Sequence, residues 1–140
     1  MLMGSEKGGS CDQHGQAVLQ ALNELIPKDA VIEVRILGTT MGTQSGYFND
    51  PRKLLEAISP HDCKYNIFFT INPVNPALLT RSVNRLTPYA KQTTADNDIV
   101  SRGWFVIDID PQRPSGVSAT DEEKESACTL AYQVMNYLVG

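Results

Sequence analysis

The segment at 104–111 carries two aspartates at the end of an apolar run. The run from Trp104 to Ile107 predicts a buried strand, because aromatic and β-branched residues in succession are typical of the inside of a sheet. Side chains alternate between the faces of a strand, so Asp108 and Asp110 (the aspartate doublet) would project from the same face. A rise of about 3.3 Å per residue places their Cα atoms about 7 Å apart. Carboxylates at this spacing can hold one divalent cation, or two cations about 4 Å apart.

Other interpretations of the doublet stay open. An aspartate before proline often forms a turn, because its carboxylate accepts a hydrogen bond from the backbone two residues later. A glycosyltransferase with an Asp-x-Asp motif is also compatible with the doublet taken alone. A calcium-binding EF-hand is excluded, because the position that requires glycine holds Arg113 and the position of the last glutamate holds Ala119.

Strand and helix patterns alternate along the rest of the chain. Alternation of apolar and polar residues predicts a half-exposed strand at 32–36, and a nearly continuous apolar run predicts a central, covered strand at 65–71. Helical spacing and capping signals predict helices at 13–26, 51–58 and 76–86 and a packed helix after Thr120, with a polar loop at 87–98. This order predicts an α/β or α+β fold in which a mixed sheet is flanked by helices. Ligands in such folds bind at the carboxyl ends of strands, where the doublet lies.

Length and composition are those of one globular domain. The chain has 140 residues, of which 41% are hydrophobic and 20% are charged, and these values are ordinary for a domain with a modest core. We expect a single domain at 13–140. The first ten residues are rich in glycine and serine, and we expect the N-terminus at 1–12 to be disordered.

The cysteines and the hydropathy pattern indicate the compartment. Cys11, Cys63 and Cys128 are odd in number and form no Cys-x-x-Cys motif, which argues against a zinc site and for the reducing cytoplasm. No apolar run approaches the roughly 18 residues of a membrane span, and the N-terminus lacks the apolar segment of a signal peptide. We therefore expect a cytoplasmic protein without a membrane partner.

The charge is unevenly distributed. A net charge of −4 argues mildly against nucleic-acid binding, but the chain between Asp62 and Asp96 has basic residues and no acidic one. Arg81, Arg85 and Lys91 in this stretch could neutralise the phosphates of a template. The two arginines are four residues apart and would share one face of the predicted helix. Basic residues on an exposed helix are also an ordinary surface, and that alternative stays open.

Four segments, in order along the chain, resemble one family. They are Ser45-Gly46-Tyr47-Phe48, the stretches 69–79 and 93–100, and the stretch 102–123 around the aspartate doublet. Together they resemble the primase–polymerases of phages and plasmids, which belong to the archaeo-eukaryotic primase superfamily. The resemblance runs from about Asp29 to the C-terminus, and the stretch 102–123 is similar to the family's first catalytic motif.

The resemblance implies a primase-like catalytic domain and template-directed nucleotidyl transfer by two metal ions. Asp108 and Asp110 would be catalytic and metal-binding, with Mg²⁺ or Mn²⁺ as the cofactor. The implied partners are a DNA template and nucleotides in phage or plasmid replication, and relatives often join such a domain to a helicase. Arg113 could contact a nucleotide phosphate or the primer end, since a guanidinium binds phosphate through two hydrogen bonds. The structural alternative for Arg113 is a surface turn between two prolines.

Two further motifs of the family are not matched. A Ser-x-His motif should follow the last predicted helix, but His14 and His61 both precede the doublet. A third carboxylate should come later still. We therefore expect the front part of a primase–polymerase domain that is inactive alone and could form a homodimer through uncovered sheet surface. The alternative is a non-catalytic remnant that binds nucleic acid or a partner chain.

Overall fold

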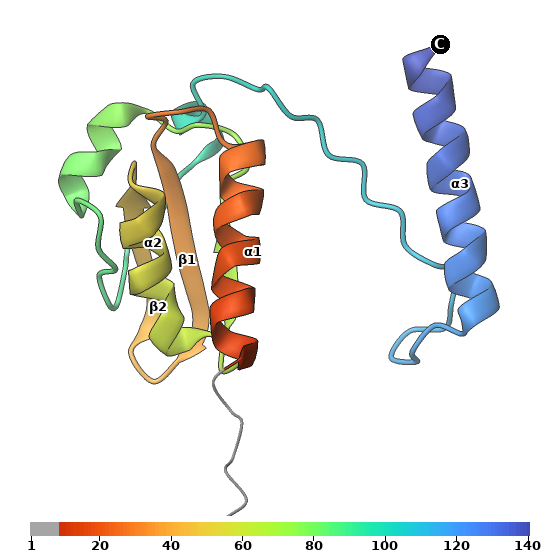
Figure 1. Cartoon of the computed structure of the whole chain (residues 1–140), viewed down its shortest axis with the longest axis horizontal. Helices are drawn as coiled ribbons and strands as arrows, with labels where there is room; N and C mark the ends of the chain where they lie inside the picture. Colours follow the sequence, from red (N-terminus) through yellow and green to blue (C-terminus); the bar gives the residue numbers. More distant parts are fainter. Residues whose placement is uncertain (1–8) are drawn as a thin grey trace, which may run out of the picture. The chain divides into compact units, whose positions relative to one another are not determined.

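Within residues 9–140, three antiparallel strands form a sheet (Figure 1). The structure, a computed structural model, describes residues 9–140, and the surroundings of side chains from Gly15 onward. β1 (Ile32–Thr39) is the central strand, paired with β2 (Gly42–Phe48) on one edge and with β3 (Asn66–Phe69) on the other. The chain is thus mixed in helix and strand, as predicted, but its described strands form an antiparallel sheet where we expected a mixed one.

The positions of the two predicted strands in the sheet are the reverse of those expected. β1, predicted to be half-exposed, is central, and Glu33 on its polar face is fully buried. β3, predicted to be central and covered, is an edge strand, with Phe68 53% exposed and Phe69 43% exposed. The alternation in β1 therefore marks two faces of different chemistry that are both covered.

α1 (Gly9–Leu25) and α2 (Pro51–Ile58) pack on one face of the sheet (Figure 1). Leu22 of α1 and Leu54 of α2 join apolar side chains of β1 and β2 in the larger core cluster. α2 begins as predicted, because Asp50 Oδ1 accepts hydrogen bonds from two backbone N–H groups of the first turn. Residues 1–8 of the predicted disordered N-terminus lie outside the described residues, and α1 includes residues 9–12.

Irregular chain covers the other face of the sheet. Tyr47, which alternates with the core residue Phe48 along β2, packs there with Val31, Val74 and Leu78. This layer includes two short 3₁₀ helices, η2 (Pro76–Arg81) and η3 (Asp96–Asp98).

The α-helix predicted at 76–86 is wrong. η2 begins as predicted after Asn75, whose side chain accepts a hydrogen bond from the Ala77 N–H, but it ends at Arg81. The next residue, Ser82, is buried and accepts a hydrogen bond from the Tyr47 N–H through its hydroxyl. Pairing with β2 thus replaces the helical hydrogen bonds that the local sequence favours.

The chain divides into two units at Trp104, and the second comprises residues 105–140. It contains an extended segment and α3 (Asp121–Val139). α3 begins after Thr120, as predicted, with a capping box in which Thr120 and Glu123 bond each other's backbone N–H groups.

The strand predicted from 104 onward is not formed. Residues 104–113 belong to no strand in the structure, and Phe105 is 86% exposed. A strand needs a neighbour for its backbone N–H and C=O groups, and residues 105–140 contain no other extended partner. None of the residues of α3 is buried, so the second unit by itself does not provide the packing predicted for this helix. Among residues 9–140, no helix is long and apolar enough to cross a membrane.

Candidate functional site

The aspartate doublet lies on the extended segment of the second unit. Asp108 and Asp110 are exposed, and neither forms a hydrogen bond or an ion pair with the residues that the structure describes. No group of three or more His, Cys, Asp or Glu side chains within the described chain is placed to hold a metal ion. The doublet therefore offers two free carboxylates on one short segment.

The Arg113 side chain forms a hydrogen bond within the turn that follows it in the chain. Its Nη1 donates a hydrogen bond to the carbonyl of Val117 over 2.6 Å. Gly116 within this turn has a φ of +77°, a conformation that favours glycine. The guanidinium is exposed, so donors other than the engaged one remain available to a ligand.

The three basic residues predicted to line a template groove lie in the first unit. Arg81 is the last residue of η2, while Arg85 and Lys91 lie on the chain that follows it, and all three are exposed. Because no helix spans 76–86, the two arginines do not share a helical face. The structure therefore does not assemble the helical basic face that the sequence predicted.

Trp104 fastens the end of the first unit. Its backbone N–H donates to Asn72 Oδ1 over 2.9 Å, and Asn72 Nδ2 donates to its carbonyl over 3.1 Å. Its indole N–H donates to the carbonyl of Leu25 at the end of α1 over 2.6 Å. The residue just before the extended segment is thus held by the chain after β3 and by α1. The structure thus gives Asn72 an anchoring role.

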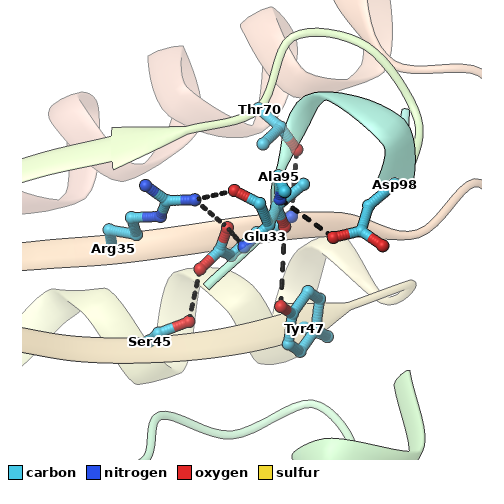
Figure 2. A network of polar contacts seen from close by, with 8 residues as sticks. Glu33, Arg35, Ser45, Tyr47, Thr70, Ala95 and Asp98 are labelled. Atoms are coloured by element: carbon cyan, nitrogen blue, oxygen red, sulfur yellow. Dashed lines mark hydrogen bonds and ion pairs between the residues drawn. The ribbon is translucent and has the colours of Figure 1, made fainter. Parts of the chain in front are cut away.

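A buried carboxylate that sequence analysis missed lies on the central strand (Figure 2). Glu33 Oε1 accepts a hydrogen bond from the Ser45 hydroxyl over 2.6 Å, and Oε2 accepts one from Arg35 Nη2 over 2.7 Å and one from the Thr94 N–H over 2.9 Å. Its backbone N–H donates to the Thr70 hydroxyl over 3.0 Å. The Glu33 side chain thereby joins β1 to β2 and to the loop that carries Thr94, and its backbone joins β1 to Thr70 after β3.

The hydrogen bonds around Glu33 decide its protonation. Burial alone would raise the pKa of the carboxyl, but hydrogen bonds from Arg35, Ser45 and Thr94 outweigh burial, and the pKa is lowered. The same bond to Glu33 raises the pKa of Arg35. Arg35 Nη2 donates a second hydrogen bond, to the Thr94 carbonyl, over 2.8 Å. The pair is therefore ionised at neutral pH and fixed in orientation.

A pocket of about 320 Å³ opens beside this pair. Its wall includes Arg35, the aromatic side chains of β3 and the loop at 94–99. The sequence does hold one signal for this pocket. Glu33 and Arg35 are two charged residues between the apolar residues of β1, although their alternation with those residues is also typical of a solvent-exposed face.

Three of the four segments singled out in the sequence, 45–48, 69–79 and 93–100, meet around this network. The chain at 69–79 lies along the chain at 93–100: Val74 and Ile99 form a β-bridge, and the Asn75 N–H donates to the Asp98 carbonyl over 2.7 Å. Segment 45–48 joins them through the Tyr47 hydroxyl, which accepts a 3.5 Å hydrogen bond from the Thr94 hydroxyl. Segments that are distant in the sequence are therefore adjacent in the fold.

Comparison with models of known protein families, with curated proteins and with solved structures finds no match to this chain.

Proposed function

We propose that this chain takes part in template-directed nucleotidyl transfer, with Asp108 and Asp110 as its metal-binding carboxylates. The observation that carries the proposal is that the doublet is exposed and free of partners among the described residues. A structural turn of the Asp-Pro kind would engage its carboxylate with the nearby backbone, and no such bond is formed at Asp110. The free oxygens are available to a cation.

The donor chemistry fits Mg²⁺ or Mn²⁺. Both ions prefer carboxylate and water oxygens, and Mg²⁺ commonly uses one or two carboxylates together with substrate phosphates. The chemistry that such ions supply is activation of a 3′-hydroxyl and stabilisation of the departing pyrophosphate. Asp108 and Asp110 would hold the ions, and the triphosphate of an incoming nucleotide would fill coordination positions that the protein leaves open.

Anchoring of the segment supports the proposal. Trp104, four residues before Asp108 in the chain, is held by Asn72 and Leu25. The first residue of the apolar run is thus ordered, and order in a reacting segment lowers the entropic cost of nucleotidyl transfer.

Arg113 would act on phosphate in this proposal. It lies three residues after Asp110 in the chain, and its exposed guanidinium retains donors beyond the one bound to Val117. A phosphate held there would be near the carboxylates by chain connectivity alone. The exposed Arg81, Arg85 and Lys91 would contribute general attraction to a template backbone.

A second candidate is a non-catalytic module that binds nucleic acid or a partner chain. The observation in its favour is that the described residues bring no third acidic or histidine ligand to the doublet. The two candidates differ in what a nucleotide does. In the catalytic one, a nucleoside triphosphate completes the metal shell and strengthens metal binding, whereas in the other it has no such effect.

Calorimetric titration with Mn²⁺ tests the proposal. We expect weak binding by the parent chain, binding that strengthens when a nucleoside triphosphate is present, and loss of both in Asp108→Asn/Asp110→Asn. The matched control is Glu122→Gln/Glu125→Gln, which removes the same charge from two exposed carboxylates of α3. Equal heats from the parent and the aspartate variant would reject the metal site. Metal binding without any effect of nucleotide would favour the non-catalytic candidate.

A further inference from the structure

Arg35 and Phe68 lie side by side on the sheet. They are register partners in the antiparallel pairing of β1 with β3, so their side chains leave the same face with Cβ atoms about 5 Å apart. The Arg35 side chain is 34% exposed and Phe68 is 53% exposed, and both line the pocket of about 320 Å³. A cation and an open aromatic ring are therefore presented together to a concave surface.

The guanidinium of Arg35 is fixed rather than mobile (Figure 2). Its Nη2 donates to Glu33 Oε2 over 2.7 Å and to the Thr94 carbonyl over 2.8 Å. Glu33 itself is fully buried with both oxygens bonded. Nη1 forms no hydrogen bond with the residues that the structure describes, so its donors remain for a ligand. A donor held in advance in this way loses little conformational freedom when it binds.

The charges of the pocket select the ligand. Glu33 neutralises Arg35, and Asp96 adds a further negative charge to the lining. A phosphate is therefore a poor occupant. A neutral planar ring with a hydrogen-bond acceptor at its edge suits an aromatic face beside an N–H donor. The volume lies at the lower end of the range, about 300–1,000 Å³, that holds small ligands.

We propose that this pocket binds a nucleobase, whose ring stacks on Phe68 while a carbonyl oxygen or ring nitrogen accepts a hydrogen bond from Arg35 Nη1. The inference rests on the proposed function to the extent that nucleotidyl transfer requires a protein to hold bases. The base can belong to a free nucleotide or to a single-stranded template. The recognising chemistry is the same in both cases, and the sugar and phosphates stay outside the pocket.

Phe68→Ala is the informative substitution. Phe68 is more than half exposed, so its truncation leaves the fold intact, whereas replacing Arg35 would leave the buried Glu33 carboxylate without its cation. Leu37→Ala is the matched control, since Leu37 lies on the same face of β1 as Arg35, is 39% exposed and is not part of this pocket. Phe68→Tyr retains the ring and should retain binding. Thermal melts establish that all three variants are folded.

Two binding measurements, both in EDTA, distinguish the sources of the base. Saturation-transfer NMR with deoxyguanosine and deoxycytidine reports the free base, and fluorescence anisotropy of a labelled single-stranded oligonucleotide reports a template. We expect binding in at least one measurement, an affinity reduced at least about fivefold by Phe68→Ala, and no change with Leu37→Ala. The nucleoside arm should be insensitive to salt, because no phosphate is bound.

Absence of binding in both arms, or equal affinities of the parent and Phe68→Ala, overturns the inference. The test is independent of the metal site, because Asp108→Asn/Asp110→Asn should bind the base as the parent does in EDTA. If the calorimetric test fails and the base test succeeds, the metal site is wrong and the pocket stands. The opposite result rejects the pocket alone.

Discussion

Asn72 and Trp104 exchange two hydrogen bonds, one between the Trp104 N–H and Asn72 Oδ1 at 2.9 Å and one between Asn72 Nδ2 and the Trp104 carbonyl at 3.1 Å. The Asn72 amide thereby satisfies both the backbone N–H and the backbone C=O of Trp104, which are the two groups that a neighbouring strand would otherwise pair with. The apolar run that carries the aspartate doublet is thus paired at its first residue and unpaired afterwards.

Asn72→Ala removes this pairing and should loosen Trp104. We expect the free energy of unfolding to fall by about 1 kcal/mol, because hydrogen bonds at a partly exposed site contribute modestly. Since Trp104 is the single tryptophan, its emission should move to longer wavelength and its amide should exchange faster. Asn97→Ala changes an exposed asparagine of η3 and serves as the control. Unchanged emission in Asn72→Ala would contradict the anchoring role.

Gly46→Ala should destabilise the protein severely. A Cβ at Gly46 would lie 2.1 Å from the carbonyl oxygen of Arg85, and a backbone atom cannot move aside as a flexible side chain can. We expect a loss of about 3 kcal/mol or more in the free energy of unfolding. Gly103→Ala is the matched control, because an added Cβ there meets nothing within 4 Å. Urea denaturation of both variants measures the difference, and similar midpoints would show that the loop at Arg85 is not packed on β2.

Glu33→Gln should alter both stability and its dependence on pH. The pKa of Glu33 is lowered in the folded protein from its ordinary value of 4.5. The carboxylate therefore contributes stability that is fully present above about pH 4.5 and is lost as the pH falls through the folded-state pKa. At pH 7 we expect the variant to be less stable by about 2–3 kcal/mol, because charge-assisted hydrogen bonds are replaced by weaker ones and an amide N–H₂ faces a donor.

The gap between the parent and Glu33→Gln should narrow as the pH falls below 4.5. Denaturation at neutral and acidic pH measures it, with Glu56→Gln, an exposed position on α2, as the control. A gap that is constant over this range would mean that Glu33 does not titrate with folding.

Local signals predicted parts of the fold well. α2 and α3 begin where the capping signals predicted, at the Asp50 cap and at the capping box of Thr120 and Glu123, because each cap depends on residues within one turn. The run 76–86 was mispredicted because Ser82 and Val83 pair with β2, which no local pattern reports. The antiparallel arrangement was missed for the same reason, since strand order is set by contacts between distant segments.

Sequence reasoning found exposed candidates more readily than buried ones. Asp108 and Asp110 stand out as charges after an apolar run, and their spacing is visible without a fold. Glu33 was missed because alternation in β1 predicts a solvent face, whereas in the fold Ser45 and the loop carrying Thr94 bind and cover its carboxylate. Whether a polar residue of a strand is buried or exposed depends on which distant segments of the chain cover that strand.

Replacing the doublet should leave the fold unchanged. Asp108 and Asp110 are exposed and have no partner among the described residues, so Asp108→Asn/Asp110→Asn should shift the free energy of unfolding by less than about 0.5 kcal/mol. Thermal and urea melts of the metal-free protein check this. A large destabilisation would show that the carboxylates support a turn.

Mn²⁺-induced paramagnetic broadening of backbone amide NMR signals shows where on the chain the metal ion binds, and hence whether it binds at the aspartate doublet. Broadening depends steeply on the distance to the ion, so it reports position as well as binding. We expect substoichiometric Mn²⁺ to broaden the signals around Asp108 and Asp110 first, and we expect Asp108→Asn/Asp110→Asn to remove this effect. Broadening centred on the acidic first turn of α3 at 121–125, or persisting unchanged in the variant, would contradict metal binding at the doublet.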